Sequence, residues 1–120
     1  INNTFTALNY WDKPTISGWA APSSKYINLT LGASGTEYTA PANGYYNLYK
    51  ASNAAAQYVA WRVKPPGATI PTFYHRDYAP TSGNSVESSV YVSRGSIVQI
   101  VYTLGGATTI FNFVYAEGEI

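Results

Sequence analysis

The sequence concentrates its chemically useful side chains in the stretch YHRDY, residues 74–78. His75, the only histidine, stands two residues before Asp77, and residues i and i+2 of a strand share a face, so this carboxylate could orient the imidazole as a general base. Acyl transfer would also need an activated nucleophile, and the chain has no cysteine and no serine in a strand-to-helix elbow. We therefore expect His75 to be a polar residue at the end of a strand.

Other enzymatic and metal sites have little support. Hydrolysis of glycosidic bonds needs two carboxylates that face each other across a cleft, and the six acidic residues are scattered without a pattern that pairs them. No spacing of Asp, Glu or His matches a calcium or zinc motif. We expect no catalytic residue, no metal ligand and no cofactor.

The same stretch suits the recognition of a ligand, because it combines aromatic rings with planar hydrogen-bond donors and precedes a long polar tract. The first candidate set for binding a sugar or a peptide is Tyr74, His75, Arg76, Asp77 and Tyr78. The second candidate set is an aromatic patch within residues 1–25, formed by Tyr10, Trp11 and Trp19. The alternative for Arg76 and Asp77 is an ion pair, with each other or across a subunit boundary.

The composition limits the classes of partner. Charged residues make up 11% of the chain, whereas about 25% is typical of soluble domains. The seven cations are scattered and the net charge is +1, so we expect no nucleic-acid partner. No apolar run approaches the roughly 18 residues of a spanning helix, and we expect no membrane insertion. Twelve tyrosines, three tryptophans and four phenylalanines suit strands, interfaces and sugar-stacking surfaces alike.

Alternating apolar side chains predict an all-β domain. We expect strands at residues 26–32, 37–39, 57–64, 70–76 and 86–92, with a loop at 77–84. Residues 57–64 place Val59, Trp61 and Val63 on a core face and Tyr58, Arg62 and Lys64 on the opposite face. Asn43-Gly44 is the strongest local hairpin signal, and Gly44 and Gly95 are expected to permit turns. Eight or so short strands indicate one sandwich or jelly-roll domain that spans residues 1–120. Its irregular edge segment is expected at 1–25 and its core at 26–117.

The end of the chain contains its most apolar strands. Residues 98–104 and 110–116 flank Gly105-Gly106, which predicts a hairpin. Apolar side chains occupy both faces of each strand, whereas a hairpin in a small antiparallel sandwich buries one face. A chain of 120 residues has one core, so we expect another chain to cover the second face.

Three patterns then occur in order along the chain. The first is an aromatic residue followed by Gly-x-aromatic-x-apolar, at Tyr38, Gly44, Tyr46 and Leu48. The second is a strand entry, at Val92, Gly95, Ser96, Val98 and Ile100. The third is the final strand, at Phe111, Asn112, Phe113, Val114 and Tyr115. Together they resemble the globular heads of the complement and tumour-necrosis-factor superfamily, with Ser96 where that family usually has Asp, and with Asn112 or Phe113 in place of a glycine.

Within that superfamily, the segments LTLGASGTEYTAPANGYY and FNFVYAEGEI look most like the tip domains of bacteriophage tail fibres and tail needles. The resemblance implies a jelly roll of about 8–10 strands, a homotrimer around a three-fold axis, a place in the virion, and attachment to a glycan or protein receptor on the bacterial host. The residues that the resemblance places at the trimer interface are Tyr46, Leu48, Val98, Ile100, Phe111, Phe113 and Tyr115. Which face of the terminal strands lines the axis stays open.

Two other functions remain possible at this point. The domain could register three chains for assembly of a fibre shaft without binding a receptor. It could instead be a carbohydrate-binding module of a secreted protein that stacks sugars on Trp11, Trp19 or Trp61, although Trp61 is expected in the core. Because the first residue is Ile1 and not Met, we expect the C-terminal domain of a longer protein.

Overall fold

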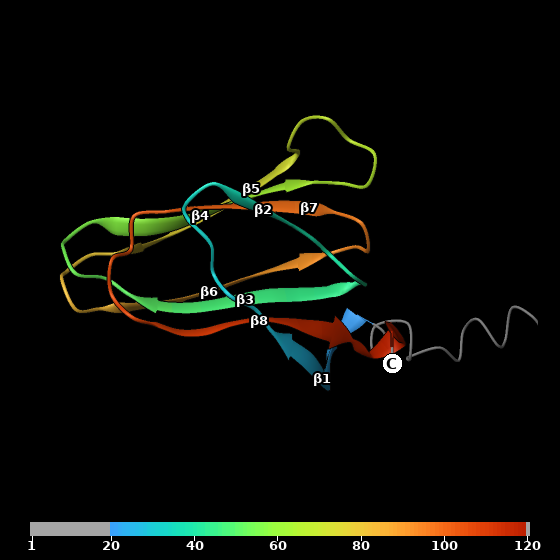
Figure 1. Ribbon diagram of the computed structural model, residues 1–120, viewed down its shortest axis with the longest axis horizontal. Coiled ribbons are helices and arrows are strands. Elements are labelled where there is room, and N and C mark those ends of the chain that lie inside the picture. Colours follow the sequence, from blue (N-terminus) through green and yellow to red (C-terminus); the bar gives the residue numbers. More distant parts are fainter. Residues whose placement is uncertain (1–19, 120) are drawn as a thin grey trace, which may run out of the picture.

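The computed structural model describes residues 20–119, which form eight strands and a short terminal 3-10 helix. The elements are β1 (Pro22–Asn28), β2 (Thr36–Thr39), β3 (Gly44–Ala51), β4 (Gln57–Lys64), β5 (Phe73–Ala79), β6 (Ser85–Val92), β7 (Ile97–Tyr102), β8 (Thr108–Ala116) and η1 (Glu117–Glu119). They make two four-stranded antiparallel sheets, ordered β1-β8-β3-β6 and β2-β7-β4-β5. Figure 1 shows the sheets as two stacked layers. The prediction of an all-β sandwich is confirmed.

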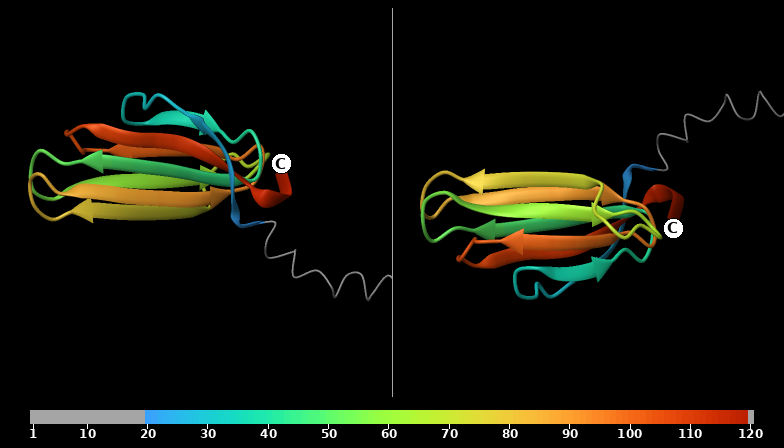
Figure 2. Two further views of the ribbon diagram at one scale, coloured as in Figure 1. Left: turned by 90° about the horizontal axis from the view of Figure 1, so that it is seen from below. Right: turned by 90° about the horizontal axis from the view of Figure 1, so that it is seen from above.

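The strand order is that of a jelly roll. The first strand pairs with the last, and the next pairs inward are β2 with β7, β3 with β6 and β4 with β5. Every connection except the one from β4 to β5 passes from one sheet to the other. Figure 2 looks onto the outer face of β1-β8-β3-β6 on the left and of β2-β7-β4-β5 on the right.

The core fills the space between the sheets with alternate side chains of each strand. Trp61, Val59 and Val63 of β4 are at most 7% exposed, as their spacing predicts. The inward valines of β6, at 86, 90 and 92, are also buried. Tyr38 of β2 packs edge-on against Phe111 of β8 at a ring-centroid distance of 5.1 Å, so aromatic rings span the gap between the sheets.

The prediction of a terminal hairpin is wrong. β7 pairs with β2 and β4, whereas β8 pairs with β1 and β3, so the segment that contains Gly105-Gly106 carries the chain between sheets. The Asn43-Gly44 hairpin is wrong for the same reason, since β2 and β3 also lie in different sheets. A short glycine-containing connection permits either geometry, and the choice depends on partners that are distant in the sequence.

The two glycines singled out from the sequence have different roles. Gly95 has a φ of 84°, and it permits the turn before β7 as predicted. Gly44 lies at the start of β3, where a Cβ atom would be 2.2 Å from the carbonyl oxygen of Val114. Gly44 is therefore needed for the close approach of β3 to β8, not for a turn.

Several strand ends also differ from the sequence pattern. β1 begins at Pro22, so the predicted irregular segment at 1–25 overlaps a strand, and residues 1–19 of that segment lie outside the described residues. β5 begins at Phe73 and extends to Ala79, because residues 77–79 pair with β4 although their types favour a loop. This extension keeps the whole stretch 74–78 in a strand.

Candidate functional site

β5 divides the predicted ligand-binding stretch between two faces. Tyr74, Arg76 and Tyr78 point outward from β2-β7-β4-β5, while His75 and Asp77 share the face of the buried Ala79. The division follows from the two-residue period of a strand. Tyr10, Trp11 and Trp19 lie outside the described residues.

The inner side of β5 contains a chain of hydrogen bonds. His75 Nε2 and Asp77 Oδ2 are 2.8 Å apart, which confirms that these side chains touch. Ser88 donates to the same Asp77 oxygen, and Trp61 Nε1 donates to Ser88 Oγ at 2.6 Å. Because the carboxylate lies between the hydroxyl and the imidazole, the histidine is not placed to take the serine proton, as a nucleophilic triad requires. The chain of bonds instead joins edge strand β5 to β6 and β4.

The outer side of β5 borders a groove of about 630 Å³ on the face of β2-β7-β4-β5. Residues of all four strands line it, and those on the outward side of the sheet with polar or aromatic side chains are Glu37, Arg62, Lys64, Tyr74, Arg76 and Gln99. Ala60, Trp61 and His75 also border the groove. Thr69 and Pro71 line it from the β4–β5 connection, which stands out beyond this sheet in Figure 1. Of the charged groups, Glu37 and Lys64 are paired at 3.0 Å.

Arg76 is held in place by two tyrosines. Its guanidinium carbon lies 4.5 Å from the ring centroid of Tyr58 and 5.8 Å from that of Tyr78. Arg76 Nη1 donates to the Tyr78 hydroxyl at 3.1 Å, and this hydrogen bond raises the pKa of the already basic guanidinium. The result is a permanent cation in a defined orientation on the outer face.

Arg62 lies between Gln99 of β7 and Tyr74 of β5 in the cross-strand register. Among the described residues, no hydrogen bond or ion pair engages its guanidinium. The predicted pair of Arg76 with Asp77 within this chain is wrong, because the two side chains point to opposite faces of β5. The groove therefore has two arginines without a carboxylate partner among residues 20–119.

The outer face of the other sheet, β1-β8-β3-β6, is organised in cross-strand rows. The first row is Tyr26, Val114, Tyr45 and Tyr91. The second row is Asn28, Asn112, Asn47 and Ser89. The third row is Ile110, Tyr49 and Glu87. Tyr45 and Tyr91 contact each other at 4.9 Å between centroids, and Asn47 Nδ2 donates to Asn112 Oδ1 at 3.0 Å. We call these rows the tyrosine-asparagine face; Glu87 is their one charged residue.

The predicted trimer-interface residues lie elsewhere. The six that are at most 4% exposed in a single chain are Tyr46, Leu48, Val98, Ile100, Phe111 and Phe113. They fill the core between the two sheets, so their assignment to contacts between chains is wrong. Tyr115 packs against the same core and has the Lys25 ammonium 4.4 Å from its ring centroid. The sequence placed these residues on common faces, but it did not show which face meets the partner sheet.

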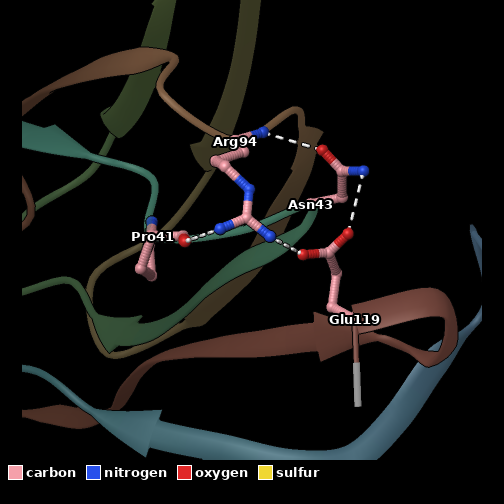
Figure 3. Close-up of polar contacts among 4 residues, drawn as sticks. All are labelled: Pro41, Asn43, Arg94 and Glu119. Atoms are coloured by element: carbon pink, nitrogen blue, oxygen red, sulfur yellow. Dashed lines mark hydrogen bonds and ion pairs between the residues drawn. The ribbon is translucent and has the colours of Figure 1, made fainter.

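A polar cluster joins the end of the chain to two loops, as Figure 3 shows. Arg94 donates through its backbone to Asn43 Oδ1 at 2.8 Å and pairs through its side chain with Glu119. Asn43 Nδ2 in turn donates to Glu119 at 3.2 Å. These residues are far apart in the sequence and follow no motif, so nothing in the pattern points to them. The contacts indicate a structural role at this end of the sandwich.

Within residues 20–119, no group of three or more His, Asp or Glu side chains could hold a metal ion. The same residues contain no helix with the length and hydropathy of a membrane span. In comparisons with known proteins, the chain matches no family model, no curated protein and no solved structure.

Proposed function

We propose that the domain is a trimeric, non-enzymatic receptor-binding knob at the tip of a bacteriophage fibre or needle, and that it attaches the particle to the bacterial surface. The observation that carries the proposal is the contrast between the outer faces of the sandwich. The tyrosine-asparagine face has one charged residue in three rows, whereas the opposite face has a groove with three cations and one carboxylate.

The tyrosine-asparagine face is suited to contact with copies of itself. Tyr26, Tyr91 and Ile110 are 56%, 46% and 41% exposed, although large apolar and aromatic side chains gain from leaving water. Eight-residue strands in a four-stranded sheet present a face of about 26 Å by 19 Å, which is about 500 Å² before the relief of the side chains is counted. A standard interface buries about 800 Å² per partner, so residues at the rim of the sheet have to contribute as well. The asparagine row can satisfy its amides across such an interface without burying a charge.

The placement in a phage appendage rests on the resemblance of the sequence patterns, and the packing supports it. The aromatic residues of the first and third patterns meet in one cluster, with Tyr38 5.1 Å from Phe111 and Tyr46 5.0 Å from Phe113 between centroids. The strand order β1-β8-β3-β6 puts the terminal strand in the sheet that we propose for the axis.

Light scattering on the purified domain tests the assembly. We expect a mass three times that of the 13.0 kDa chain. Flow cytometry of the fluorescent trimer on a panel of bacterial strains then tests attachment, with the heat-unfolded domain as the control. A folded domain that stays monomeric at high concentration would contradict the assembly, and a trimer that binds no strain would contradict attachment.

A second candidate is registration of three chains for assembly of a fibre shaft. The tyrosine-asparagine face favours this function, because registration requires an interface between chains and no receptor-binding surface. Deletion of the domain from the parent particle separates the two functions. Loss of assembled particles indicates registration, whereas normal particles that fail to adsorb indicate receptor binding.

A further inference from the structure

The groove on β2-β7-β4-β5 has the chemistry of an anion-binding surface. Its lining includes Arg62, Lys64 and Arg76 but only one carboxylate, Glu37, and that carboxylate is paired with Lys64 at 3.0 Å. The two arginines are therefore the uncompensated charges of the groove among the described residues. Arg76 is oriented by Tyr58 and Tyr78, so part of the entropy of ordering it is lost before any ligand binds.

The neighbouring side chains suit a sugar ring. Tyr74 is 64% exposed at the groove and pairs across the strands with Arg62, so an aromatic face lies beside a planar donor. Aromatic rings stack on the apolar faces of sugars, while guanidinium groups bind carboxylates through two parallel hydrogen bonds. Thr69 adds a hydroxyl and Gln99 an amide oxygen for hydroxyl groups at the same surface, while Gln99 Nε2 donates to the Gly35 carbonyl oxygen at 3.1 Å.

The position of the groove argues against an extended acidic peptide. A peptide strand binds a sheet through unpaired backbone groups at an edge. The centre of the groove lies over β4 and β7, which are both paired on their two sides, so the backbone groups of these strands are occupied. The edge strand β5 also borders the groove, but it does so on the face of the sheet, through the outward side chains of Tyr74 and Arg76. Recognition must then use side chains, and hydroxyls and carboxylates of a saccharide are suitable partners for arginine, glutamine and threonine.

We propose that this groove binds an acidic polysaccharide, with Arg62 and Arg76 contacting sugar carboxylates and Tyr74 stacking on a ring; the proposal rests on the receptor-binding function proposed above and specifies its ligand. Because the groove and the tyrosine-asparagine face are on opposite sides of the sandwich, a trimer that uses the latter leaves the groove open to the host surface.

Titration calorimetry of the purified domain provides the test. The probes are polygalacturonate, alginate, hyaluronate and polysialate, with fully methyl-esterified polygalacturonate as the neutral match and poly-glutamate as the peptide match. We expect at least one acidic polysaccharide to bind about tenfold or more tightly than the neutral polymer and poly-glutamate, with weaker binding as salt rises. Equal binding of the neutral polymer, preference for poly-glutamate, or no binding of any acidic polysaccharide would overturn the proposal.

Matched variants locate the site. Arg62→Gln and Arg76→Gln should each weaken binding by about fivefold or more, because each removes a charge-assisted contact. Arg94→Gln removes the same charge from an exposed arginine outside the groove and should leave the affinity unchanged. Circular dichroism verifies that each variant is folded, and equal losses in all three would show general charge attraction instead of a site.

The outcome is separable from that of the proposed function. A domain that forms trimers and binds cells but ignores every acidic polysaccharide refutes only the ligand class. A domain that binds an acidic polysaccharide through Arg62 and Arg76 as a monomer supports the groove and refutes the trimeric knob.

Discussion

The outer faces of the two sheets arise from the same alternation of side chains, yet they differ in charge. On β1-β8-β3-β6, the rows of tyrosine, asparagine and aliphatic residues include one charged side chain, Glu87. On β2-β7-β4-β5, four charged side chains surround a groove. In a chain with 11% charged residues, this uneven distribution is informative, because an uncharged sheet face tolerates burial against protein whereas a cationic groove has to remain hydrated or bind an anion.

The largest expected effect comes from a charge placed on the tyrosine-asparagine face. Asn47→Asp puts a carboxylate at the centre of the tyrosine-asparagine face, where an interface would leave it buried and unpaired at a cost of about 3–5 kcal/mol. We expect this variant to dissociate into folded monomers. Light scattering measures the mass and circular dichroism measures the fold.

Gln99→Glu is the control, since it makes the same change of charge on the opposite outer face beside Arg62. It should keep the mass of the parent protein. If Gln99→Glu dissociates the assembly while Asn47→Asp does not, the two faces have been assigned to the wrong roles.

Alkaline titration tests the assignment of the inner side of β3. Burial raises the pKa of Tyr46 from 10.0 to about 12, so the folded state retains the proton more tightly than the unfolded state. The free energy of unfolding should therefore fall as the pH rises from 10 to 12, and by up to about 3 kcal/mol. Urea unfolding at a series of pH values measures this loss.

Tyr46→Phe is the matched control because it keeps the ring and removes the ionisable group. The other tyrosines are present in both proteins, so the difference between the two pH profiles isolates Tyr46. Parallel profiles would mean that Tyr46 is not buried in the core of the single chain.

Alanine substitutions of two adjacent serines compare the inner and outer sides of β6. Ser88→Ala leaves Trp61 Nε1 without its acceptor and removes a donor to Asp77, which should cost about 1–3 kcal/mol of unfolding free energy. Ser89→Ala, on the exposed side, should change it by less than about 0.5 kcal/mol. Urea denaturation measures both, and equal small effects would show that the hydrogen-bond chain contributes little to stability.

The smallest expected effect concerns the charge of the groove. Glu37→Gln removes the carboxylate that pairs with Lys64, so affinity for an acidic polysaccharide should increase by about two- to threefold, while stability changes by less than about 1 kcal/mol. Glu87→Gln makes the same change on the tyrosine-asparagine face and should leave this affinity unchanged. Titration calorimetry compares them, and an equal increase in both variants would mean that net charge alone sets the affinity.

Parts of the candidate site follow from the strand period. The contact of His75 with Asp77, and the outward side of β4 with Tyr58, Arg62 and Lys64, were expected from positions two residues apart. The cation–π contact of Arg76 with Tyr58 and the hydrogen bond from Ser88 to Asp77 were not expected. The residues of each pair are on different strands, and no spacing in the sequence sets the register of those strands.

The sequence by itself determined that this chain forms short strands, that Val59, Trp61 and Val63 share a buried face, and that the terminal strands are unusually apolar, because alternation within a strand is a local property. Only the tertiary structure decided that β7 and β8 belong to different sheets. The pairing of sheets decides which of two apolar faces is inside, so Phe111 and Phe113 fill the core of one chain and the opposite side of the same strand forms the tyrosine-asparagine face. That choice depends on contacts between residues far apart in the chain, and no local pattern encodes it.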